Sequence, residues 1–170
     1  LNKEVLVFKD NQTVLFQTAP GDGIELYNGR TSSTNADNLI VRYMRMRAGR
    51  QVSGSDNIDA GGAAYGHDQI YDHCSFTWGT DECFSLNNDK QPEGLYNITL
   101  QNSILGQGCQ NHSCGGLVQT SDEEGITVYR NLFIDNKTRN FKVKGLNQFV
   151  NNVLYNWGNG AAYNMGGESS

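Results

Sequence analysis

An all-β solenoid, specifically a right-handed single-stranded parallel β-helix, is the fold that the sequence predicts. Short strand-like segments recur along the chain at intervals of 29, 28 and 21 residues, and no stretch has the apolar rhythm of a helix. A single coil of that length cannot bury its apolar face alone, so neighbouring coils must stack. We therefore predict one β-helix domain over residues 1–170, as a fragment of a longer β-helix.

The recurring segments alternate apolar and polar residues and share one feature near their ends. In each, a small or polar residue is followed two positions later by a large apolar one. The segments cover residues 69–76, 98–105, 126–133 and 148–155. Their small or polar column contains Cys74, Ser103, Asn131 and Asn152. Their apolar column contains Phe76, Leu105, Phe133 and Leu154. We expect each column to stack through successive coils.

Second strands are expected between these segments, at residues 83–86, 116–119, 141–144 and 162–165, and residues 1–16 supply the first strands. A leucine-rich repeat would need a fixed Leu and Asn spacing, which is absent. An antiparallel sandwich would need hairpin turns, and Asn28-Gly29 and Asn159-Gly160 are too few to build it. Two or three strands per coil with turns of unequal length therefore favour a parallel β-helix.

The open ends of such a solenoid give a first testable prediction. Uncapped strand edges can pair with other chains, so we expect the isolated chain to be poorly stable or to self-associate through its ends. Sedimentation measurements check this expectation. A stable monomer would contradict either the self-association or the assignment of the chain as a fragment.

Composition excludes several classes of function. The net charge of −5 argues against general nucleic-acid binding, which needs a basic surface. The sequence contains no apolar run long enough to cross a membrane. The four cysteines form no CxxC pair, which argues against a structural zinc site. Cys109 and Cys114 could close a small loop by a disulfide, or all four cysteines could be buried thiols.

Two groups of charged residues are candidates for chemistry if the second strands stack in register. Asp59, Asp81 and Glu82 offer only oxygen ligands, which suit a hard cation such as Ca²⁺; the alternative is a set of solvated turns. Arg139 lies in a basic stretch that also contains Lys142 and Lys144. This stretch is either a solvent-facing turn or a clamp for a polyanion, because guanidinium holds a carboxylate through two points.

The histidines do not have the spacing of metal ligands. His67, His73 and His112 are widely separated. Asp72 and His73 could suggest a catalytic dyad, but adjacent strand residues point to opposite faces of a sheet. We therefore interpret this pair as part of a turn or of the core.

One long motif resembles a known family. Residues 71–82 read YDHCSFTWGTDE, which is similar to a stretch of the pectate lyase superfamily, polysaccharide lyase family 1. Shorter similar stretches make the resemblance extend over essentially the whole chain. They are residues 17–24, 38–43, 114–117, 129–133, 138–140 and 151–158.

The resemblance implies a secreted, Ca²⁺-dependent enzyme that cleaves polygalacturonate, or a pectin oligosaccharide, by β-elimination. It implies that Asp59 and Asp81 bind calcium, with Glu82 or Ser85 as a further ligand. Arg139 resembles the catalytic base. The substrate-binding residues that it implies are Lys144, Lys142 and His112. Phe141 stands where the family usually has proline, and Lys144 replaces a common arginine.

Three alternatives remain beside this interpretation. A pectin lyase would act on methyl-esterified chains without Ca²⁺, and has less use for Asp59 and Asp81. A non-catalytic carbohydrate-binding or adhesin β-helix is disfavoured by Arg139 beside the acidic group. An inactive fragment of an enzyme is the third alternative.

Overall fold

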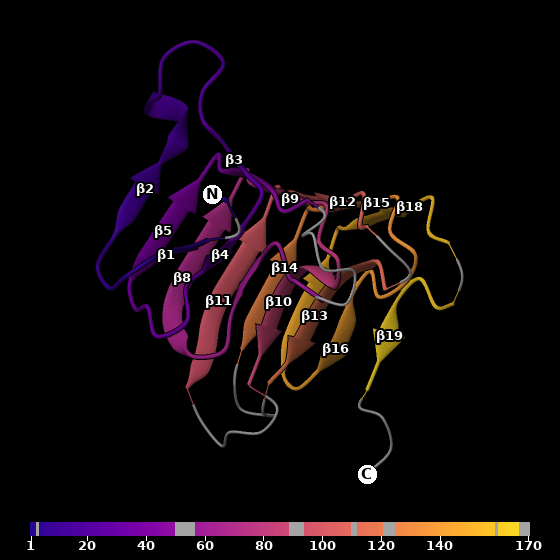
Figure 1. Cartoon of the computed structure of the whole chain (residues 1–170). Coiled ribbons are helices and arrows are strands. Elements are labelled where there is room, and N and C mark those ends of the chain that lie inside the picture. Colours follow the sequence, from indigo (N-terminus) through magenta and orange to yellow (C-terminus); the bar gives the residue numbers. More distant parts are fainter. Residues whose placement is uncertain are drawn as a thin grey trace.

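The computed structural model describes residues 1–2, 4–49, 57–88, 94–109, 112–120, 125–158 and 160–166. Within them, short parallel strands coil around a common core, and the predicted parallel β-helix is confirmed. Figure 1 shows the strands following one another from the indigo N-terminal end to the yellow C-terminal end. Among the described residues, no helix is long and apolar enough to cross a membrane.

Three long parallel sheets form the walls of the coil. The first sheet contains β2 (Thr13–Leu15), β5 (Leu39–Arg42), β8 (Gly66–Asp72), β11 (Leu95–Gln101), β14 (Ile126–Tyr129) and β17 (Asn147–Val150). The second sheet contains β3 (Glu25–Tyr27), β6 (Arg45–Arg47), β9 (Ser75–Thr77), β12 (Ile104–Gly106), β15 (Leu132–Ile134) and β18 (Val153–Tyr155). The third sheet contains β7 (Gly61–Ala63), β10 (Glu82–Asn87), β13 (Cys114–Gln119), β16 (Lys142–Lys144) and β19 (Asn164–Met165). Near the N-terminus, β1 (Val5–Val7) pairs with β4 (Arg30–Ser32), and a 3-10 turn covers Phe16–Thr18.

The register of the second sheet confirms the predicted apolar column, and the third sheet contains the predicted second strands. In the second sheet, Leu105 lies opposite both Phe76 and Phe133, and Phe133 lies opposite Leu154. In the third sheet, the four predicted second strands correspond to β10, β13, β16 and β19, paired in that order. The repeat spacing therefore predicted which residues stack on which.

Aromatic side chains fill the interior between the sheets. The Phe84 ring lies 4.7 Å from Phe76 and 5.0 Å from Tyr71, measured between ring centroids. Phe141, which stands where the family usually has proline, is fully buried and contacts Phe133 edge-to-face at 5.2 Å. A side chain at Gly116 would meet the Phe141 ring, since a Cβ added to this glycine would lie only 2.5 Å from it. Phe141 thus anchors the start of β16 in the core.

The small or polar column lies in the turns between the first and second sheets. Its side chains form a ladder of hydrogen bonds from one coil to the next. The Cys74 amide donates to Ser103 Oγ at 3.0 Å, and the Ser103 amide donates to Asn131 Oδ1 at 2.9 Å. The Asn131 amide in turn donates to Asn152 Oδ1 at 2.9 Å. Each buried polar side chain therefore satisfies a backbone group of the preceding coil.

Replacing Asn131 with leucine should lower the free energy of unfolding by about 3 kcal/mol, because it leaves the Ser103 amide and the Leu100 carbonyl without partners. Urea denaturation of the whole chain measures this change. Gln148→Leu, an exposed position on β17, is the matched control and should shift stability little. Equal stability of the two variants would show that the ladder does not stabilise the coil.

The connection between the first and second sheets has the same length in successive coils. Two residues separate β8 from β9, β11 from β12, β14 from β15 and β17 from β18. The first of the two residues has a left-handed backbone in each case, and the second belongs to the ladder. The connections from the second to the third sheet differ in length, from the short link before β10 to the longer links before β13 and β16.

Candidate functional site

The three carboxylates predicted as metal ligands lie where the chain enters the third sheet. Asp59 precedes β7, Asp81 precedes β10, and Glu82 is the first residue of β10. His112 precedes β13 and Arg139 precedes β16, so successive coils bring these residues to one edge of the sheet. The amide of Glu82 donates a hydrogen bond to Asp59 Oδ1 at 3.1 Å, which fixes the two carboxylates beside each other.

The predicted base Arg139 and the predicted substrate-binding residue His112 both contact the carboxylates directly. Arg139 Nη1 donates to Glu82 Oε1 at 2.6 Å, although 57 residues separate the two in sequence. His112 Nε2 lies 2.9 Å from Asp81 Oδ1. Asp81 Oδ1 is buried and has no partner of hydrogen-bond geometry among the residues that the structure describes, so the His112 contact is a close approach rather than an aligned hydrogen bond.

Burial makes negative charge costly at this cluster. Burial raises the pKa of Asp59, despite the hydrogen bond from the Glu82 amide. Burial and the neighbouring Glu82 raise the pKa of Asp81 to about 6. Burial also raises the pKa of Glu82, whose side chain is only 4% exposed. Carboxylates crowded in this way attract a positive charge to their centre.

Arg139 supplies part of that positive charge. Burial by itself lowers the pKa of Arg139, but the hydrogen bond and charge of Glu82 outweigh burial and hold this pKa above its ordinary value. The residue has a left-handed backbone, with φ of +51°. Beside Glu82, Arg139 therefore stays positively charged.

The donor atoms at the cluster suit a divalent cation. Ligand atoms of Asp81, Glu82, His112 and Cys114 all lie within 4.8 Å of one another. Cys114 was absent from the sequence-based site, and the structure places it opposite Glu82 in the third sheet. Burial and the charge of Glu82 raise the pKa of the Cys114 thiol to about 12, so it stays protonated at neutral pH. The carboxylate oxygens are therefore the ligands that fit a hard cation.

The other predicted site residues flank this cluster. Lys142 and Lys144 point outward from β16, because Val143 between them is buried. Ser85 is buried in β10 and lines a hollow of about 240 Å³ together with Asp59 and Arg30. Between the two open alternatives for the cysteines, the structure has free thiols, with Cys109 only partly buried.

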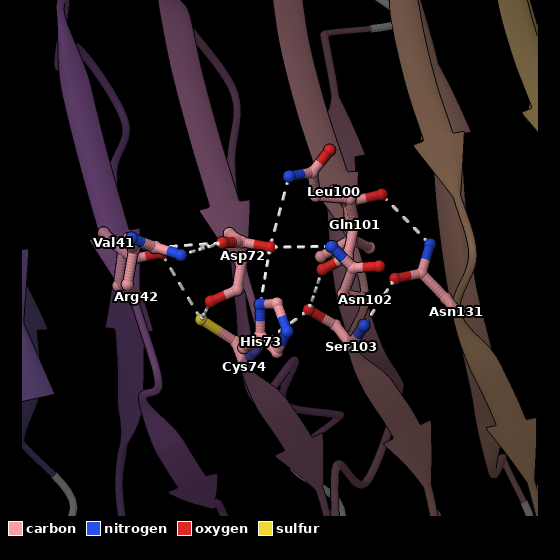
Figure 2. Close-up of polar contacts among 10 residues, drawn as sticks. All are labelled: Val41, Arg42, Asp72, His73, Cys74, Leu100, Gln101, Asn102, Ser103 and Asn131. Carbon is pink, nitrogen blue, oxygen red and sulfur yellow. Dashed lines mark hydrogen bonds and ion pairs between the residues drawn. The ribbon is translucent and has the colours of Figure 1, made fainter. Parts of the chain in front are cut away.

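Asp72 and His73 form a contact that the sequence analysis did not expect. Their side chains do not point to opposite faces: His73 Nδ1 lies 2.8 Å from Asp72 Oδ1 (Figure 2). The reason is that His73 has a φ of +55°, which ends the strand alternation. Of the predicted turn or core pair, Asp72 is the buried last residue of β8 and His73 begins the turn that follows. Arg42 also contacts Asp72 Oδ2, through Nε at 2.9 Å and Nη2 at 2.8 Å.

Asp72→Asn should lower the free energy of unfolding at neutral pH by about 1–2 kcal/mol, through loss of charge-assisted hydrogen bonds. Burial raises the pKa of Asp72, but hydrogen bonds from Asn102, Gln101, His73 and Arg42 outweigh it and lower the pKa. The stabilisation is therefore present above the ordinary carboxyl pKa, and is lost as the pH falls through the lowered value. Thermal unfolding at a series of pH values from neutral to acidic measures the stability difference between the unmodified chain and Asp72→Asn, which should become smaller as the pH falls. The exposed Asp135→Asn is the control, and a difference independent of pH would contradict the prediction.

Comparison with curated proteins gives close matches to one named group. The chain is 53% identical over 162 residues to a probable pectate lyase C of Aspergillus flavus, covering 95% of this chain and 36% of that relative. It is also 53% identical over 163 residues to a probable pectate lyase C of Neosartorya fischeri. A third relative of the same name, from Emericella nidulans, is 52% identical over 166 residues. The chain spans little more than a third of the length of these relatives, 36–37%. No family model matches the chain.

Proposed function

We propose that this chain, a partial-length member of the pectate lyase family, is the part that cleaves polygalacturonate by Ca²⁺-dependent β-elimination. The observation that carries the proposal is the contact of Arg139 with Glu82, inside a cluster of buried carboxylates. The names of the relatives support the activity, and the donor set supports the cation. The same similarity supports an extracellular location, where a pectin-degrading enzyme meets its substrate.

In this proposal Asp59, Asp81 and Glu82 hold the calcium ion. When bound there, Ca²⁺ withdraws electrons from the uronate carboxylate and so acidifies the adjacent C5–H. Asp81 Oδ1 is buried with no aligned hydrogen bond from any described residue, and a cation bound there would take the place of the close contact with His112. Lys142 and Lys144 supply positive charge along the same edge for the remaining uronate groups, and His112 lies there as a further contact.

Arg139 takes the proton in the proposed reaction. A guanidine nitrogen accepts the C5 proton, and the electron pair of that C–H bond forms the C4=C5 double bond of the product. The C4–O bond breaks with its electron pair going to the glycosidic oxygen, which takes a proton from water. Arg139 must leave Glu82 to act as a base, because Glu82 holds its pKa high. Release from Glu82 would remove the hydrogen bond that raises this pKa, while burial would still oppose the charged form of Arg139.

The competing functions make different demands on the same residues. A pectin lyase binds uncharged methyl esters and gains little from three buried carboxylates. A binding module has no need of an arginine held against them. An inactive fragment stays a real alternative, because the chain covers only 36% of its relative from Aspergillus flavus.

The test is the release of unsaturated product, followed by its ultraviolet absorbance, from polygalacturonate and from methyl-esterified pectin, with and without a chelator. We expect product from polygalacturonate that disappears with chelator. Product from esterified pectin that survives chelator would identify a pectin lyase. Binding without product from either polymer would leave the binding module or the inactive fragment.

A further inference from the structure

Bulky side chains occupy left-handed positions in the two-residue turns between the first and second sheets. Tyr43, His73 and Arg130 have φ values of +57°, +55° and +55°. Asn102 and Asn151 fill the same position in other coils. Asparagine tolerates this conformation, whereas larger side chains are disfavoured in it. Such conformations persist only where the surrounding structure fixes them, and they cluster at functional sites, so this column is a candidate for one.

The rings of the column are exposed and held in place. Tyr43 and His73 stack with ring centroids 4.8 Å apart and planes 19° apart. Tyr43 is 40% exposed, and the His73 side chain is 44% exposed. Asp72 fixes His73 through Nδ1, as Figure 2 shows, and the Arg42 guanidinium lies 5.6 Å from the Tyr43 ring centre. The structure thus presents a preorganised aromatic platform to solvent.

Two hollows lie along this platform. The first, of about 480 Å³, is lined by Tyr43 and Arg45 among others. The second, of about 760 Å³, is lined by Tyr129 and Arg130 among others. His73, Asn102 and Ile104 line both, so the hollows meet along the helix axis. Exposed rings, amides and guanidinium groups therefore follow one another along a single strip.

The charges of the strip favour an anionic ligand. The carboxylate of Asp72 is already paired with Arg42. Arg45 donates to the backbone carbonyl of Asp22, and both residues line the first hollow. Arg130 makes no ion pair with any residue that the structure describes, and its guanidinium lies 5.8 Å from the Tyr129 ring centre. Arg130 is thus available to a carboxylate from outside.

We propose that this strip is a second contact surface for an acidic polysaccharide, separate from the candidate functional site. Sugar rings would stack on Tyr43 and His73, hydroxyl groups would bind Asn102, and a uronate carboxylate would pair with Arg130. One position recurs per coil, at the strand spacing of about 4.8 Å, which is close to the length of one pyranose ring. A glycan running along the axis would therefore meet a new side chain at each sugar.

The strip and the candidate functional site lie at opposite ends of the second-sheet strands. His73 precedes β9, whereas Asp81 follows it. The strip would therefore hold polymer without entering the catalytic edge. The inference rests on the proposed function for its choice of a polyuronate, and its test does not require turnover.

The experiment is affinity electrophoresis of the whole chain in native gels containing polygalacturonate and a chelator. The variant is Tyr43→Asn/Arg130→Asn, because asparagine is the residue that the column itself uses at positions 102 and 151. The control is Tyr96→Thr, which removes a similar stack from another surface. There the Tyr96 and His67 rings stack with their centroids 4.6 Å apart. Gels with neutral hydroxyethyl cellulose test the need for negative charge.

We expect polygalacturonate to retard the unmodified chain and the control equally, and the double variant to bind roughly tenfold more weakly. Thermal unfolding should show that the double variant is folded, and its turnover of trigalacturonate should be unchanged. Equal retardation of the double variant, or equal retardation by neutral polymer, would overturn the inference. If the unmodified chain has no lyase activity but the double variant still loses retardation, the inference is sustained and the proposed function is refuted.

Discussion

Arg139→Lys should lower turnover of polygalacturonate by roughly 10²–10⁴-fold while leaving binding nearly unchanged. Lysine keeps the positive charge and can still pair with Glu82. Its side chain is shorter, however, and presents one compact ammonium in place of the guanidinium that reaches Glu82 at 2.6 Å. The nitrogen therefore does not reach the position from which Arg139 takes the proton. Initial rates of unsaturated-product formation and equilibrium binding in chelator measure the two effects.

The control for this substitution is Arg47→Lys, because Arg47 also has a carboxylate neighbour, Glu25 at 3.5 Å, but lies on the second sheet. Its turnover should match that of the unmodified chain. The rate should also rise with pH in the alkaline range, since an arginine base works only in its deprotonated form. Full turnover by Arg139→Lys, or a flat or acidic pH–rate profile, would remove Arg139 from the role of base.

Asp81→Asn should raise the calcium concentration needed for half-maximal activity by about tenfold or more, because calcium affinity follows the number of charged ligands. The same change should stabilise the calcium-free protein at neutral pH. Burial and Glu82 raise the pKa of Asp81 to about 6, so the ionised carboxyl destabilises the fold at higher pH. Asparagine removes that penalty, which amounts to about 1 kcal/mol after allowance for solvent exposure.

Calcium titrations of activity and thermal unfolding in chelator measure these opposite effects. Asp68→Asn is the control, because Asp68 is exposed and lies beside His67 and Asn97 on a different surface. It should change neither quantity by much. An unchanged calcium requirement in Asp81→Asn would place the cation elsewhere. Lower stability of Asp81→Asn in chelator would show that the contact of Asp81 with His112 outweighs the cost of burying the ionised carboxyl.

The coil was predictable because stacking repeats a visible pattern. The feature shared by Cys74, Ser103, Asn131 and Asn152 set the register, and the structure places these residues in one ladder. The hydrogen bonds of the ladder were not predicted, because a column of small polar residues does not reveal which backbone groups lie within reach.

The candidate site was predictable in part. The motif and the expected stacking pointed to Asp59, Asp81, Glu82 and Arg139, which the structure brings to one edge. The contact of His112 with Asp81 and the nearness of Cys114 depend on the path of a longer connection, which periodicity does not define. The predicted orientation of the Asp72 and His73 side chains was wrong, because the alternation of side chains along a strand fails at a left-handed residue.

The turns between the first and second sheets keep one length from β8 onward, whereas the links between the second and third sheets vary in length. This difference determines where such a chain can diverge. Between the first and second sheets, an inserted residue would displace a ladder side chain and break its hydrogen bonds to the neighbouring coils. Between the second and third sheets, the link before β10 is already shorter than the links before β13 and β16, and these three links contain Asp81, His112 and Arg139. Insertions and deletions can therefore remodel the reactive edge, while the opposite turn keeps the coils aligned.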